Sequence, residues 1–161
     1  MQRGFLAGVS VFAIALGATA VLWISHARKV EAHCQVPCGI YDDPARIARL
    51  KEDAATIAKA TDQIGQLAGQ HDAQAFNQAA RWVSTKETHA THIIDVVSEY
   101  FLTQKVKTVA PGADGYDAYL KKLADHHAVM VAAMKTKQNV SASHVHTLQH
   151  AIDTLGAYYK K

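Results

Sequence analysis

The residues best suited to chemistry in this chain are its only two cysteines, Cys34 and Cys38, and the histidine that precedes them, His33. Thiolates are soft anionic metal ligands, and an imidazole is a good nitrogen ligand. If the chain is cut after Ala32, His33 becomes the amino terminus and adds a free amine beside the backbone amide of Cys34. Two nitrogens and two sulfurs in one plane suit a square-planar ion such as nickel(II) or copper(II). The segment 33–41, called the hook below, is therefore predicted to hold a redox metal.

The first 32 residues are predicted to be a signal peptide or propeptide. Residues 4–25 form an apolar run without formal charge, preceded by Arg3. Val30 and Ala32 occupy the two positions that a signal peptidase reads, so the cut would fall just ahead of His33. This interpretation predicts an exported protein, periplasmic or extracellular, with signal peptidase as a processing partner.

An alternative interpretation keeps this segment in the membrane. An apolar run of about 20 residues is long enough to cross a bilayer as a helix. Residues 4–25 would then anchor the protein, and His33 would have no free amine to offer a metal. The amino terminus of the natural protein distinguishes export with cleavage from anchoring.

The charge of the chain argues against nucleic acid as a partner. The formal net charge is +3, but the predicted targeting segment holds three cations, Arg3, Arg28 and Lys29, against one anion, Glu31. The rest is nearly neutral, whereas nucleic-acid binding requires a strong basic patch. Residues 33–161 suffice for one domain with one core, and two cysteines are too few for a disulfide framework.

The chain after the hook predicts an all-α fold. Apolar residues recur at spacings of three and four, as in amphipathic helices, and no segment alternates like a strand. Asp43 and Pro44 fit a helix start as N-cap and first residue, and Asp72 fits the next N-cap. Short connections predict an antiparallel four-helix bundle, with the hook projecting from the first helix. The expected helices are 44–69, 73–104, 116–137, and a fourth that begins at 139 or 141; the second is long enough to allow a kink or break near Ser84-Thr85.

Large apolar residues define the faces that are expected to point inward. In the second helix this face includes Phe76 and Val83, and in the third it includes Leu120 and Met134. In the fourth helix the face includes Leu148. These assignments follow from helical periodicity alone.

The pattern H-C-x-x-P-C-G-x-Y at a processed amino terminus, followed by a helical domain of this length, resembles nickel superoxide dismutase. The resemblance covers residues 33–161, and the segment Ser98-Glu99-Tyr100-Phe101 is a second, weaker match. It implies one nickel ion per subunit, which cycles between +2 and +3 while superoxide is disproportionated to oxygen and hydrogen peroxide. It also implies a homohexamer of four-helix bundles.

The resemblance further implies a role for each site residue. The equatorial ligands would be the amine of His33, the amide of Cys34, and the thiolates of Cys34 and Cys38. The His33 imidazole would bind in the oxidised state. Tyr41 and Tyr100 would order water and limit the access of anions, which makes them the predicted catalytic residues.

The sequence departs from the family at three positions. Gln35 stands where familiar members have an aspartate. Ala48 and Thr85 stand where the family has the glutamate and the arginine that hold the axial imidazole. The ligands are intact, but the groups that usually orient such a ligand are missing from the aligned positions. The candidates to replace them are Glu52, Lys86 and Glu87.

Other interpretations of the same residues stay open. Cys34 and Cys38 would form a disulfide in an oxidising compartment if no metal bound them. A non-catalytic exported protein that binds nickel or copper would use the same donors. Helical histidines such as His89 and His92 are expected on solvated or partly buried faces. The paired Glu-x-x-His motifs of di-iron bundles and the C-x-x-C-H motif of c-type cytochromes are both absent from the sequence.

Overall fold

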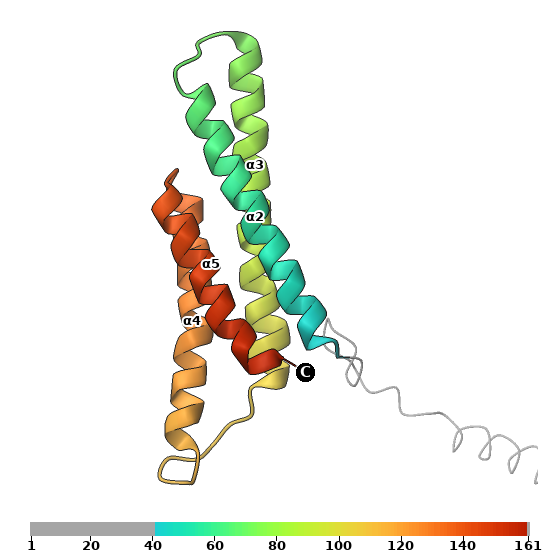
Figure 1. Ribbon diagram of the computed structural model, residues 1–161, viewed down its shortest axis with the longest axis vertical. Coiled ribbons are helices and arrows are strands. Elements are labelled where there is room, and N and C mark those ends of the chain that lie inside the picture. Colours follow the sequence, from blue (N-terminus) through green and yellow to red (C-terminus); the bar gives the residue numbers. More distant parts are fainter. Residues whose placement is uncertain (1–40, 161) are drawn as a thin grey trace, which may run out of the picture. The chain divides into compact units, whose positions relative to one another are not determined.

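The computed structural model describes residues 41–160, which contain helices and no strand (Figure 1). The all-α prediction is therefore confirmed for this part of the chain. No helix within it is long and apolar enough to span a bilayer. The predicted anchor 4–25 and the predicted ligands His33, Cys34 and Cys38 lie outside the described residues.

The described chain contains four α-helices, a π-helical segment and a 3₁₀ turn. They are α2 (Asp43–Leu67), α3 (Ala73–Asp95), the π-helical segment (Val96–Lys105), α4 (Tyr116–Gln138), α5 (Ala142–Gly156) and the 3₁₀ turn (Ala157–Tyr159).

Two adjacent aspartates have different roles at the start of α2. Asp42 is the N-cap, because its Oδ1 accepts a hydrogen bond from the backbone N–H of Ala45 at 3.1 Å. Pro44 follows in the first turn, where a backbone N–H has no intrahelical partner. The prediction that Asp43 is the cap was thus wrong by one residue. Its side chain is left for contacts with other elements.

The start of α3 agrees with the prediction. The Oδ1 atom of Asp72 accepts a hydrogen bond from the backbone N–H of Ala75 at 2.9 Å, which satisfies one unpaired donor of the first turn. The helix has no break at Ser84-Thr85, since α3 continues through these residues to Asp95. The change in backbone geometry comes later in the chain.

The backbone becomes π-helical over Val96–Lys105, the part of the predicted second helix that carries Tyr100. The N–H of Val106 bonds to the carbonyl of Phe101 at 2.9 Å, which is the spacing of five that defines a π-turn. Such turns are uncommon and often occur at functional sites. The segment therefore changes the angular order of the side chains that follow Tyr100.

The helices meet in one hydrophobic core. Helix α2 packs against α3 and α5, and α4 packs against the same two helices. Burying one large aliphatic side chain stabilises a fold by about 1.5–3 kcal/mol, so these contacts account for much of the stability. The fully buried aliphatic residues of the core include Leu50, Ile57, Ile93, Leu148 and Ile152.

The predicted inner faces of α3 and α4 are partly wrong. Phe76 is 62% exposed, and Leu120 and Met134 are 44% and 40% exposed. The buried face of α4 carries smaller or polar side chains instead, because alanines there allow neighbouring helices to approach closely. This face consists of His126, Val129, Ala132, Ala133 and Thr136.

Candidate functional site

The two tyrosines predicted to act in catalysis lie together. Tyr41 directly precedes the N-cap of α2, and Tyr100 lies in the π-helical segment. Their ring centroids are 5.8 Å apart, with the ring planes at 71°. This edge-to-face contact is a favourable arrangement of aromatic rings. Tyr41 is 39% exposed and Tyr100 is 1% exposed, so the pair has one solvent-facing and one buried member.

Asp43 holds the hydroxyl group of Tyr100. The hydroxyl donates to Asp43 Oδ1 at 2.6 Å, and Lys105 Nζ lies 3.1 Å from Asp43 Oδ2. Burial, followed by the hydrogen bond to Asp43 and the charge of that carboxylate, raises the pKa of Tyr100 well above its usual value. Tyr100 therefore stays protonated at any physiological pH.

Tyr41 is held by two residues from the end of the π-helical segment. Its hydroxyl donates to Gln104 Oε1 at 3.3 Å, and Lys105 Nζ lies 4.3 Å from the centre of its ring. A cation at this distance from an aromatic face is attracted to it. Gln104 Nε2 donates to the carbonyl of Glu99 at 3.1 Å, which fixes the orientation of the amide.

A cation lies beside each ring of the tyrosine pair. The guanidinium of Arg46 lies 5.2 Å from the centre of the Tyr100 ring, and Lys105 bridges Tyr41 and Asp43. Lys122 interacts electrostatically with Asp43 and Lys105. Burial lowers the pKa of Lys122, the Asp43 carboxylate raises it, and the Lys105 ammonium lowers it further. A cluster of this sign attracts small anions.

A layer of rings supports Tyr100 from behind. The ring centroids of Tyr100 and Phe101 are 5.0 Å apart, and those of Phe101 and Tyr159 are 4.4 Å apart. The Tyr159 hydroxyl donates to His126 Nε2 at 2.7 Å, while His126 Nδ1 donates to the carbonyl of Lys122 at 2.6 Å. His126 is fully buried. Tyr100 is thus held on a packed, hydrogen-bonded base.

The sequence did not identify Asp43, Gln104 or Lys105 as site residues. The sequence pattern assigned Asp43 to the N-cap of the first helix. Hydrophobic periodicity cannot show which way a side chain points at the end of a helix, because the pattern stops there. The available signal was the polar run 103–105, which begins two positions after Phe101 and ends in Gln104 and Lys105.

The residues considered as replacements for the imidazole tether have other partners. Glu52 pairs with Arg49 at 3.0 Å. Lys86 is buried, and its Nζ donates to the backbone carbonyls of Thr136 and Lys137 at 2.5 and 2.7 Å. Lys86 therefore caps the end of α4. Its third contact, 3.3 Å long, is with Glu87.

Asp53 joins α2 to two of the helical histidines. Its carboxylate is 1% exposed and contacts the Nδ1 atoms of His89 and His92 at 2.6 and 2.5 Å. Because one buried carboxylate is shared by both rings, the arrangement fixes the packing of α2 on α3. Among residues 41–160, no group of three or more histidine, cysteine, aspartate and glutamate side chains could hold a metal ion.

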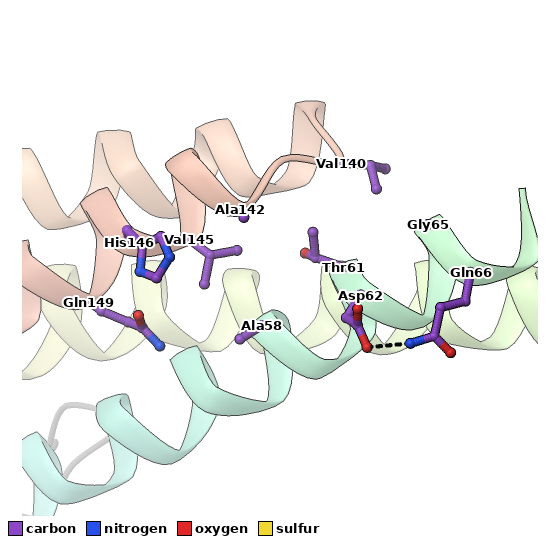
Figure 2. A pocket seen from close by; sticks show the side chains of 10 residues that line it. All are labelled: Ala58, Thr61, Asp62, Gly65, Gln66, Val140, Ala142, Val145, His146 and Gln149. Atoms are coloured by element: carbon purple, nitrogen blue, oxygen red, sulfur yellow. Dashed lines mark hydrogen bonds between the residues drawn. The ribbon is translucent and has the colours of Figure 1, made fainter.

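A cavity of about 480 Å³ lies between α2 and α5, and neither Tyr41 nor Tyr100 lines it (Figure 2). The Thr61 hydroxyl lines it, is buried, and has no hydrogen-bond partner within the described residues. On its rim, Gln66 Nε2 donates to Asp62 Oδ2 at 2.7 Å. The cavity contains none of the predicted site residues.

The structure describes a helical protein in which Tyr41, three positions after Cys38 in the sequence, lies against Tyr100. Residues 28–161 match the family of nickel-containing superoxide dismutases. This match covers most of the chain, and the protein belongs to that family. Neither the curated proteins nor the solved structures gave a match. The protein is a nickel-dependent superoxide dismutase, an oxidoreductase that acts on superoxide.

Proposed function

We propose that His33, Cys34 and Cys38 hold one nickel ion per subunit after the chain is cut behind Ala32. The donor set fits this metal, because two thiolates, an amine and a deprotonated amide are strong donors that suit a square-planar ion and stabilise its higher oxidation state. Nickel supplies the electron transfer, by cycling between +2 and +3, that converts superoxide to oxygen and hydrogen peroxide.

In this proposal Tyr41 and Tyr100 order water and limit the access of anions to the metal. The supporting observation is that the two rings meet, 5.8 Å apart, where the hook joins α2. Tyr41 follows Cys38 by three positions, and three steps of extended chain span at most about 11 Å. The Tyr100 proton is engaged by Asp43, so the orientation of the Tyr100 hydroxyl group is fixed.

We further propose that residues 33–161 form an antiparallel four-helix bundle and that six copies assemble. The mutual packing of the helices supports the bundle, since α2 and α4 each lie against both α3 and α5. The hexamer follows from family membership. Exposed apolar side chains such as Phe76 and Val83 are available for contacts between subunits. Size-exclusion chromatography with light scattering tests this assembly.

Export is the remaining part of the proposal. Signal peptidase would remove residues 1–32, and the mature protein would act in the periplasm or outside the cell. The sequence Val30-Glu31-Ala32 supports a cut at this point. Retention of residues 4–25 as a membrane anchor is the competing outcome, because it leaves His33 without its amine.

The decisive experiment produces the full chain in a host that exports it and supplies nickel. Mass spectrometry of the amino terminus, nickel content and superoxide removal are then measured on the same sample. We expect a terminus at His33, one nickel per chain and dismutation, and we expect Cys38→Ser to lose both metal and activity. An intact terminus, or a correctly processed protein that binds nickel or copper without dismutation, would contradict the proposal.

A further inference from the structure

The π-helical segment brings two consecutive residues, Gln104 and Lys105, to Tyr41. Gln104 Oε1 accepts a hydrogen bond from the Tyr41 hydroxyl, and Lys105 Nζ lies 4.3 Å from the centre of the Tyr41 ring. Lys105 also pairs with the carboxylate that holds Tyr100. In a regular α-helix of 3.6 residues per turn, positions 100 and 105 would be about 140° apart around the axis. The bonding of each residue to the fifth one before it brings them onto one side.

We propose that Gln104 and Lys105 are positioning residues for superoxide dismutation, an inference that rests on the function proposed for the tyrosine pair. Gln104 fixes the Tyr41 hydroxyl. Lys105 fixes the Tyr41 ring and neutralises Asp43, so that the carboxylate can hold Tyr100 without repelling the anionic substrate.

The contacts of Tyr41 explain why such residues are needed. Tyr41 precedes the first residue of α2 and is 39% exposed, so no helix of its own fixes its side chain. Its described contacts are the Tyr100 ring, the Gln104 amide and the Lys105 ammonium. Two of these three come from the last two residues of the π-helical segment.

The charges explain why residue 105 is a cation. Asp43 is partly exposed, and its carboxylate lies at the tyrosine pair that superoxide would approach. An unpaired carboxylate there would repel a superoxide ion. Lys105 lies 3.1 Å from it, while Arg46 faces the Tyr100 ring and Lys122 faces the Tyr159 ring. Lys105 is thus the cation that contacts both the Asp43 carboxylate and the Tyr41 ring.

The electrostatic part is tested with nickel-loaded protein at low and high ionic strength. At about 0.01 M salt the screening length is about 30 Å, and at 1 M it is about 3 Å. We expect Lys105→Gln to lower kcat/KM about three- to tenfold at low salt, since steering by a charge acts on association, and the deficit to shrink at high salt. Lys105→Arg should restore the rate. Adding Asp43→Asn to Lys105→Gln should recover part of it.

The control is Lys135→Gln, which removes an exposed lysine of α4 that has no part in the site. It should leave kcat/KM and its salt dependence unchanged. Nickel content must stay equal in all variants. If Lys105→Gln matches the wild type at low salt, or if the double variant is no faster than Lys105→Gln, the electrostatic role of Lys105 is wrong.

The positioning part is tested by NMR of the Tyr41 ring signals in the full chain, before and after nickel loading. We expect Gln104→Leu and Lys105→Gln to shift these signals in both states, and Lys135→Gln to leave them unchanged. Unmoved Tyr41 signals would overturn the inference. A wild-type protein that takes up no nickel or lacks dismutation would instead overturn the proposed function, and the signals recorded before loading separate the two failures.

Discussion

Replacing Lys86 with methionine is expected to lower the free energy of unfolding by about 3–5 kcal/mol, as when one partner of a buried charged interaction is removed. Lys86 lies on α3 and is 2% exposed. Its ammonium donates to the carbonyls of Thr136 and Lys137, in the last turn of α4, at 2.5 and 2.7 Å. The side chain therefore joins the middle of one helix to the end of another.

The magnitude follows from these contacts. Each hydrogen bond from a charged donor contributes about 1.5–3 kcal/mol, and a cation at the negative end of a helix dipole adds about 0.3–1 kcal/mol. Methionine fills a similar volume, so the cavity term is small. The variant also avoids the cost of burying an ammonium group, which offsets part of the loss.

Urea unfolding followed by circular dichroism measures the effect. With a slope of about 2 kcal/mol per molar urea, the midpoint should fall by about 2 M. Lys135→Met, at an exposed lysine of the same helix end, should change the free energy by less than about 0.5 kcal/mol. A loss below about 1 kcal/mol for Lys86→Met at an unchanged slope would show that water satisfies the carbonyls of α4, and would refute the reasoning.

Three further predictions concern residues away from the hook. Asp72→Ala should destabilise the protein by about 1 kcal/mol in urea unfolding, because the first turn of α3 loses its cap. Asp53→Ala should cost about 2–4 kcal/mol in the same assay, since His89 and His92 lose a buried carboxylate. Burial lowers the pKa of His126 below its ordinary 6.5. The unfolded chain then binds more protons as the pH falls. Stability should therefore decrease from about pH 7 to pH 5, and this decrease, followed by thermal melts, should be smaller in His126→Gln.

Helix content and helix limits could be predicted well, because they depend on short-range chemistry. Asp72 is the last residue of a polar connection and comes directly before a segment with helical apolar periodicity. In the structure its carboxylate caps α3. The predicted helices 44–69 and 116–137 correspond to α2 and α4 within two residues at each end. The family resemblance selected Tyr41 and Tyr100, and the structure places their ring centroids 5.8 Å apart.

The inner face of α4 could not be predicted, since periodicity gives most weight to the largest apolar side chains. Leu120 and Met134 define one stripe, yet packing buries the side that carries Ala132 and Ala133. Small residues permit close contact between helices, and this benefit depends on what the neighbouring helix presents. Buried His126 is acceptable there because Tyr159 supplies a hydrogen bond from the far end of the chain.

The residues that hold the tyrosines lie at the limits of helical elements, where sequence periodicity is least informative. Asp43 is the first residue of α2 and Lys105 is the last residue of the π-helical segment. With aspartates at both 42 and 43, composition cannot decide which one caps the helix and which one contacts Tyr100. The structure assigns the cap to Asp42, and only then is Asp43 free to join Tyr100 to Lys105. The hook thus predicts a metal by its residue types, whereas the contacts of the tyrosine pair depend on one-residue differences in where helices begin and end.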